Sequence, residues 1–155
     1  MASLCVPIHA NVTRPTTARH VPGVSYRTMP YSILSVDDEF DVTELLRFHL
    51  TKAGYEVFTA SSGREAIETI RCRRPDLVLL DLMLPDIDGF GVCEILRRNS
   101  ATATIPIIIL SAWATTDARN VGIDLGALDY VTKPFSPHDL VERVNRLFRS
   151  CADPG

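Results

Sequence analysis

The sequence predicts an α/β fold in which five parallel strands are covered on both faces by five helices. Short apolar runs of strand length alternate with segments whose apolar residues recur at helical spacing. The loops between them are short, so each strand–helix–strand unit makes a right-handed crossover and consecutive strands run parallel. We therefore expect a doubly wound sheet, with its functional residues beyond the carboxyl ends of the strands.

The first half of this pattern gives two strands and two helices. Tyr31 precedes a short apolar run, and a longer segment with helical spacing follows it. Gly54 and Pro75 are suited to end the two helices, because glycine favours the left-handed conformation at a helix end and the residue before proline disfavours helix. The elements expected here are a strand at 32–36, a helix at 40–54, a strand at 55–60 and a helix at 63–74.

The second half repeats the order three times. Its first strand, LVLLDLML, and the strand IPIIILSA are almost continuously apolar, as expected for strands buried on both faces. The last helix has Ser136 at its N-cap position and Pro137 as its first residue. The elements expected here are strands at 77–84, 105–112 and 129–133 and helices at 88–99, 115–127 and 136–150.

One domain is expected, at residues 31–150. The chain has 155 residues, 46% of them hydrophobic, which suffices for one domain with a buried core. Residues 1–30 show neither period, so we expect a disordered N-terminal extension, or a start assigned upstream of the natural one at Met29. A targeting peptide is the alternative, although no amphipathic helix is evident. Residues 151–155 form a short tail.

The composition excludes several classes of protein. Residues 31–155 hold 13 basic and 19 acidic groups, which argues against direct nucleic-acid binding. No stretch approaches the roughly 18 apolar residues of a membrane span. The four cysteines are scattered, without a CxxC pair or a histidine at ligand spacing, so neither a zinc site nor a disulfide framework is indicated. We therefore expect idle thiols and a cytoplasmic location.

Acidic side chains stand at the ends of two of the expected strands. Asp37 and Asp38 come directly after the first strand, and Asp81 lies in the buried third strand, where an uncompensated carboxylate is costly. Carboxylates brought together at one sheet edge repel and raise one another's pKa. A divalent cation removes this conflict, and a few hard oxygen ligands suit Mg²⁺. The sequence therefore predicts a magnesium site.

A hydroxyl group and an ammonium group are expected at the same edge. Ser111 lies at the end of the fourth strand and Lys133 at the end of the fifth, where they would offer a hydrogen bond and a positive charge to a phosphoryl group. Asp81 is then a candidate nucleophile that forms an aspartyl-phosphate. Each residue alone is more simply a helix cap, a loop hydroxyl or a solvated charge. Together, at four strand ends, they indicate phosphoryl transfer.

Four segments of this region carry a more specific signal: SVDDE, LLDLMLPDIDGFG, IIILSA and DYVTKPFSP. In this order and spacing they resemble the receiver domain of two-component response regulators, over about residues 31–149. The resemblance implies the flavodoxin-like strand order 2-1-3-4-5. It also implies a chain that is not an enzyme. Such a chain accepts a phosphoryl group from a sensor histidine kinase or phosphotransfer protein and switches a protein-interaction surface.

The resemblance gives roles to the acidic residues. Asp81 matches the phosphoacceptor. Asp38, Asp81 and the backbone carbonyl of Met83 match the direct Mg²⁺ ligands, and Asp37 acts through water. In receivers, the positions that match Met83 and Trp113 lie beside the phosphoryl group. Both side chains are bulky and apolar here, so we expect them to shield the phosphoryl group from water and to prolong its lifetime.

The resemblance also implies a switch. Ser111 matches the hydroxyl that moves to the phosphoryl group, and Tyr130 matches the aromatic residue that turns inward with it. Lys133 matches the lysine of the family's motif, and Pro134 the residue usually preceded by a cis peptide bond.

The segment KPFSPHDLVERV is most similar to receivers of the subfamily that usually carries a winged-helix DNA-binding domain. That subfamily forms homodimers through helix four, strand five and helix five. Leu128 and Asn145 depart from the aspartate and lysine usual there. The residues that stand where the subfamily has its intersubunit ion pairs are Arg119, Asp124, Asp129, Asp139 and Arg143.

Three other functions are weighed against this one. A phosphorylation-independent pseudo-receiver would only dock partners, but the set of acids, hydroxyl and lysine is complete. An aspartyl-phosphate phosphatase would need a general acid where Met83 stands. A flavodoxin-like cofactor binder would need a phosphate loop where SVDDEF repels phosphate. The kinase, the output and whether the chain is a stand-alone regulator or a fragment stay open.

Overall fold

The computed structural model describes residues 30–152, and the statements below concern that part of the chain. All but the last residue of the expected N-terminal extension, at residues 1–30, and most of the expected tail, at residues 151–155, lie outside it. Within the described part, no helix is long and apolar enough to cross a membrane.

Strands and helices alternate along the described residues in the predicted order. Most of the predicted ends agree to within three residues. The third strand is the largest difference, because its ladder ends at Leu80 and the chain then turns, with Gly89 N–H donating to the carbonyl oxygen of Leu82. The bounds are β1 (Ser32–Val36), α1 (Phe40–Lys52), β2 (Glu56–Ala60), α2 (Gly63–Arg73), β3 (Leu77–Leu80), α3 (Gly89–Arg98), β4 (Ile107–Ser111), α4 (Thr116–Asp124), β5 (Asp129–Thr132) and α5 (Pro137–Ala152).

The five strands form one parallel sheet in the order β2-β1-β3-β4-β5, which confirms the predicted topology. The strand order reverses at β1, which pairs with β2 on one side and with β3 on the other. The crevice at the carboxyl ends of β1 and β3 is therefore the place where this kind of sheet binds ligands.

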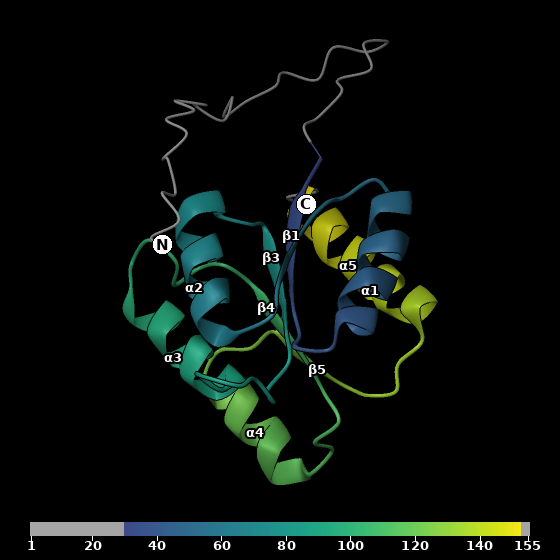
Figure 1. The fold of residues 1–155 in the computed structure, drawn as a ribbon. Coiled ribbons are helices and arrows are strands. Elements are labelled where there is room, and N and C mark those ends of the chain that lie inside the picture. Colours follow the sequence, from purple (N-terminus) through teal and green to yellow (C-terminus); the bar gives the residue numbers. More distant parts are fainter. Residues whose placement is uncertain (1–29, 153–155) are drawn as a thin grey trace.

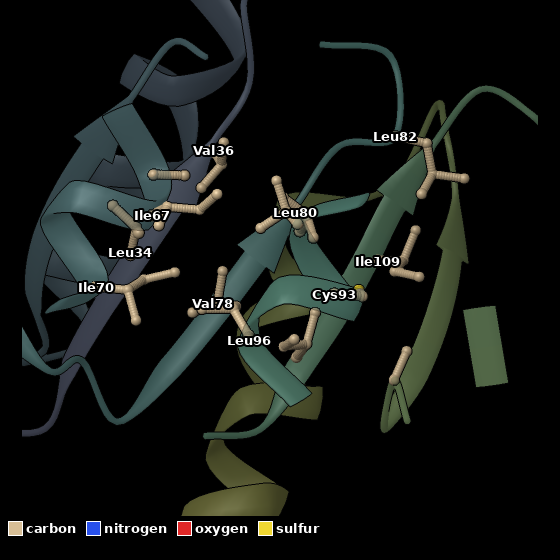
Figure 2. Close-up of a cluster of buried hydrophobic side chains, with 14 of the residues drawn as sticks. Leu34, Val36, Ile67, Ile70, Val78, Leu80, Leu82, Cys93, Leu96 and Ile109 are labelled. Atoms are coloured by element: carbon tan, nitrogen blue, oxygen red, sulfur yellow. The ribbon is translucent and has the colours of Figure 1, made fainter. Parts of the chain in front are cut away.

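Each face of the sheet has its own hydrophobic core. Helices α1 and α5 cover one face, and α2, α3 and α4 cover the other (Figure 1). Because side chains alternate along a strand, Val78 and Leu80 of β3 join one core, whereas Leu77 and Leu79 join the other. Figure 2 shows the core beneath α2, α3 and α4. Burial on both faces explains why β3 and β4 are apolar at almost every position.

Two of the described cysteines are free thiols. Cys93 is a free thiol in the core, where burial raises its pKa to about 11, and Cys151 is free and exposed. Neither takes part in a disulfide, as expected for these two residues.

Gly89 lets α3 begin directly against the backbone that follows β3. A Cβ atom at this position would lie 2.5 Å from the carbonyl oxygen of Asp81 and 2.7 Å from Cα of Leu82. The side chain of Asp88 caps the helix by accepting a hydrogen bond from Gly91 N–H at 2.8 Å. The first turn of α3 and the backbone of Asp81 are therefore held together, and only glycine fits between them.

We predict that Gly89→Ala lowers the free energy of unfolding by about 1–3 kcal/mol, because the added methyl group meets backbone atoms that have no alternative rotamer. Gly91→Ala is the matched control. It lies in the same turn, and its Cβ would meet only side-chain atoms, Cγ2 of Ile87 at 2.9 Å and Oδ1 of Asp88 at 3.5 Å, so no backbone atom has to move. Urea unfolding of both variants measures the difference. Equal stabilities would contradict the close-contact explanation.

Candidate functional site

The candidate site lies at the carboxyl edge of the sheet. The register pairs Val36 of β1 with Leu80 of β3, so Asp37 and Asp81 leave the sheet at the same level. Each is only 3% exposed. Their N–H groups still belong to the sheet, since Asp37 donates to Ala60 at 3.1 Å and Asp81 donates to Val36 at 2.9 Å. The strands themselves, rather than a loose loop, therefore position both carboxylates.

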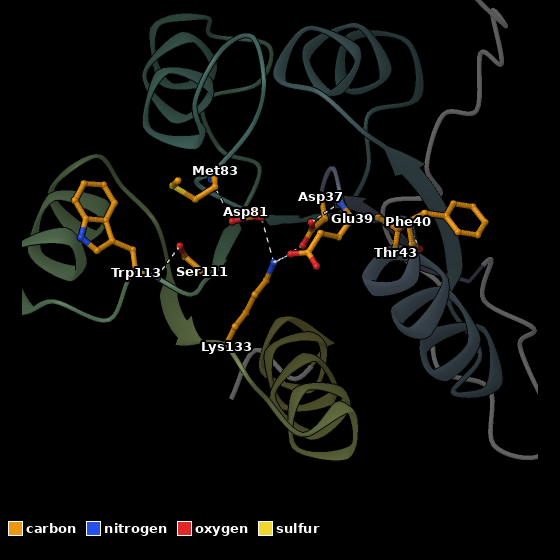
Figure 3. Close-up of polar contacts among 9 residues, drawn as sticks. All are labelled: Asp37, Glu39, Phe40, Thr43, Asp81, Met83, Ser111, Trp113 and Lys133. Carbon is orange, nitrogen blue, oxygen red and sulfur yellow. Dashed lines mark hydrogen bonds and ion pairs between the residues drawn. The ribbon is translucent and has the colours of Figure 1, made fainter.

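Lys133 places an ammonium group between these carboxylates (Figure 3). Its Nζ donates to Asp37 Oδ2 at 2.5 Å and to Asp81 Oδ2 at 3.1 Å. The backbone N–H of Lys133 donates to the carbonyl oxygen of Ser111 at 2.9 Å, which ties it to the end of β4. The peptide bond between Lys133 and Pro134 is cis, as expected. The structure thus brings three of the predicted residues into one hydrogen-bonded cluster.

Burial and charge compete in this cluster. Burial is the largest influence on the Asp81 carboxyl group, and it raises the pKa. The hydrogen bond from Met83 N–H and the Lys133 ammonium group lower the pKa, whereas the negative charge of Asp37 raises it. The pKa of Asp81 is raised overall. Burial also acts on Lys133, where it lowers the pKa of the ammonium group. The hydrogen bond to Asp37 and the charges of both aspartates outweigh it, so the pKa of Lys133 is raised. The lysine therefore stays charged between two acids.

A third carboxylate completes the acidic group. Ligand atoms of Asp37, Asp38 and Asp81 all lie within 4.8 Å of one another, and Asp38 is exposed to solvent. Met83 follows in the turn after Asp81, where its N–H donates to Asp81 Oδ1 at 3.2 Å. Three carboxylates against one ammonium group leave negative charge in a hard oxygen donor set. The residues present therefore fit a small divalent cation such as Mg²⁺.

The two predicted switch residues both contact the backbone of Trp113. Ser111 is fully buried at the end of β4, and its Oγ accepts a hydrogen bond from Trp113 N–H at 3.1 Å. Tyr130 of β5 is buried, and its hydroxyl group donates to the carbonyl oxygen of Trp113. The Tyr130 ring is therefore in an inward position in this structure. The side chain of Trp113 plays no part in these contacts.

The two predicted tuning residues are exposed beside the cluster. Met83 is 63% and Trp113 is 48% exposed. Figure 3 shows the indole directed away from Asp81, with Ser111 between them. The indole instead lies near Phe90 of α3, with ring centroids 6.1 Å apart. The helical spacing of Phe90 suits the buried face of α3, but nothing in the sequence indicates its contact with Trp113 after β4.

The five charged residues of the predicted dimer surface lie on α4, β5 and α5. Arg143 forms an ion pair with Asp129 at 2.6 Å within the chain, and Arg119 donates to the carbonyl oxygen of Tyr130 at 3.4 Å. Asn145, where the subfamily usually has lysine, accepts a hydrogen bond from the Tyr55 hydroxyl group at 2.5 Å. The residues of this surface are Arg119, Asp124, Asp129, Asp139 and Arg143.

Comparison with known proteins agrees with this geometry. The chain matches the response regulator receiver domain family over residues 33–145. It is 46% identical over 122 residues to a probable transcriptional regulator, ycf27, of Cyanophora paradoxa, a match that covers 79% of this chain and 50% of that protein. It is 43% identical over 121 residues to the alkaline phosphatase synthesis transcriptional regulatory protein PhoP of Bacillus subtilis, covering 78% and 50%. The chain spans about half the length of these relatives.

Solved structures give the same result. A crystal structure of a putative response regulator from Chloroflexus aurantiacus aligns with a TM-score of 0.72 at 43% identity, over 76% of this chain and 96% of that one. The family match spans residues 33–145, a range that includes Asp37, Asp81 and Lys133. The chain therefore belongs to the response regulator receiver domain family, as its sequence motifs implied.

Proposed function

We propose that Asp81 accepts a phosphoryl group from a sensor histidine kinase or phosphotransfer protein and that the resulting charge switches the surface formed by α4, β5 and α5. The observation that carries this proposal is the Lys133 ammonium group between Asp37 and Asp81. This arrangement keeps a nucleophilic carboxylate beside a fixed positive charge, which can balance the oxygens of an incoming phosphoryl group.

The transfer exchanges one bond for another. A carboxylate oxygen of Asp81 bonds to the phosphorus atom while the bond from phosphorus to the donor's imidazole nitrogen breaks, and the imidazole keeps the electron pair and takes up a proton. Lys133 balances charge on the attacked group, and Ser111 donates to a phosphoryl oxygen. Asp38, Asp81 and the Met83 carbonyl would hold Mg²⁺, with Asp37 acting through water, and the cation would neutralise the developing negative charge.

We propose that the backbone of Trp113 couples the phosphorylation site to the surface formed by α4, β5 and α5. When Ser111 turns toward a phosphoryl group, its hydrogen bond with Trp113 N–H changes, and Tyr130 senses this through the Trp113 carbonyl oxygen. Tyr130 belongs to β5, at the centre of the charged surface. We propose that a second copy of the chain binds there, with the ion pair between Arg143 and Asp129 rearranging between subunits.

The rival functions have less support in the site. A phosphatase needs a positioned general acid, and the thioether of Met83 cannot supply one; weak hydrolysis of the phosphoryl group is compatible with the proposal. The acidic balance of residues 31–155 favours protein partners over direct contact with nucleic acid in this part of the chain. Because a histidine kinase takes its phosphoryl group from ATP, we propose that the transfer to Asp81 takes place in the cytoplasm.

We predict that incubation with acetyl phosphate and Mg²⁺ adds one labile phosphoryl group, detected by intact mass, and that Asp81→Asn abolishes the adduct because the amide is not nucleophilic. EDTA is expected to prevent the reaction. Asp124→Asn makes the same change on the exposed surface of α4 and should keep the adduct. No adduct in a folded wild-type chain would move the protein to the pseudo-receiver class.

We predict that Met83→Asn and Trp113→Ala each accelerate loss of the phosphoryl group, because both remove apolar surface that excludes the attacking water. The expected effect is about threefold for each, the size of a modest apolar contact. The decay of the adduct mass after removal of acetyl phosphate measures the rate. Rates equal to that of the wild type for both variants would refute the shielding role.

We predict that phosphorylation promotes dimerisation and that Arg119→Glu weakens the dimer by introducing like charges at its surface. Sedimentation velocity with and without acetyl phosphate measures the change. Glu68→Arg, a charge reversal on α2 away from this surface, is the control. Identical sedimentation and identical partner binding in the two states would exclude a switch at this surface.

A further inference from the structure

Trp113 has a fixed backbone and a free side chain. Its N–H donates to Ser111 Oγ at 3.1 Å, and its carbonyl oxygen accepts from the Tyr130 hydroxyl group. The indole is 48% exposed. A side chain of this kind can change its rotamer without disturbing the backbone contacts of the residue. The position of the indole therefore depends on which neighbour it packs against.

Phe90 is the neighbour that holds the indole in this structure. The two ring centroids lie 6.1 Å apart and the ring planes are tilted by 52°, a favourable arrangement for an aromatic pair. Phe90 directly follows Gly89, whose contact with the Asp81 carbonyl group fixes the start of α3. Phe90 is thus anchored relative to the proposed phosphoacceptor, whereas Trp113 comes from the loop after β4.

The exposed side chain of Met83 is a second apolar surface that the indole can pack against. Its N–H donates to Asp81 Oδ1 at 3.2 Å, so the side chain leaves the backbone beside the carboxylate. The side chain is 63% exposed, and Figure 3 shows it on the side of Asp81 where Trp113 lies. A thioether packs well against an aromatic ring. An indole turned toward Met83 would bury apolar surface of both residues over Asp81.

We propose that Phe90 is a positioning residue, which holds the indole of Trp113 away from Asp81 in competition with Met83 and thereby shortens the lifetime of the phosphoryl group. This inference rests on the proposed function of Asp81. The two contacts are of comparable strength, so the indole divides its time between them. Loss of the Phe90 ring shifts the indole toward Met83 and over the site.

The affected step is hydrolysis. The oxygen of a water molecule bonds to phosphorus while the bond between phosphorus and the Asp81 oxygen breaks. Asp81 leaves as a carboxylate, and both protons of the water depart with the phosphate. An indole over Asp81 occupies the path of this water. The rate therefore falls as the indole spends more time near Met83.

The test compares Phe90→Leu, which keeps apolar volume against the core but removes the ring, with Phe90→Tyr, which retains the ring. After phosphorylation with acetyl phosphate and Mg²⁺, we expect the adduct to decay about threefold more slowly in Phe90→Leu and at the wild-type rate in Phe90→Tyr. The slowing should vanish when Phe90→Leu is combined with Trp113→Ala. An unchanged rate in Phe90→Leu, or the same slowing without Trp113, overturns the proposal.

A second readout does not need a phosphoryl group. Trp113 is the only tryptophan of the chain, so acrylamide quenching of its fluorescence reports on the indole alone. We expect the quenching constant to change in Phe90→Leu and to stay at the wild-type value in Phe90→Tyr. An unchanged constant in Phe90→Leu overturns the role of Phe90. A wild-type chain that takes up no phosphoryl group, with its fold intact, instead overturns the proposed function of Asp81.

Discussion

The buried contact of Lys133 with Asp37 and Asp81 is the constraint on which the rest of the site depends. A carboxylate with 3% of its surface exposed cannot stay charged without a partner, and here two of them share one ammonium group at 2.5 and 3.1 Å. Asp38 brings a third carboxylate into the cluster, so one ammonium group does not balance the negative charge. The site therefore holds together while keeping the negative charge that attracts a divalent cation.

Sheet topology makes this contact possible. β1 and β3 are neighbours although α1, β2 and α2 separate them in the sequence, and their register brings the residues after Val36 and Leu80 to one level. β4 then places Ser111 next to β5, where Lys133 continues from Thr132. Because all five strands run in one direction, the charged groups of the site lie at one edge of the sheet. An antiparallel partner would have sent its strand end to the opposite edge.

The sequence was most informative where a property repeats along the chain. The alternation of apolar periods predicted the elements, and residues at strand ends such as Asp81 and Ser111 predicted the site, because each can be read from a local pattern. Contacts between distant residues have no such signal. The packing of Phe90 against Trp113 and the hydrogen bond from Tyr55 to Asn145 depend on distances that only the folded chain defines.

Charge explains why this edge suits a switch. A phosphoryl group on Asp81 would replace one negative charge by roughly two, together with three strong acceptor oxygens. Ser111 is fully buried at this edge and its Oγ accepts a hydrogen bond from Trp113 N–H, so a turn of the hydroxyl group would direct its proton toward such an oxygen. Turning that hydroxyl alters the hydrogen bond from Trp113 N–H, and the Trp113 carbonyl oxygen already carries the Tyr130 hydroxyl. A change of charge at one strand end would thereby be converted, through the backbone of Trp113, into a change of packing on β5.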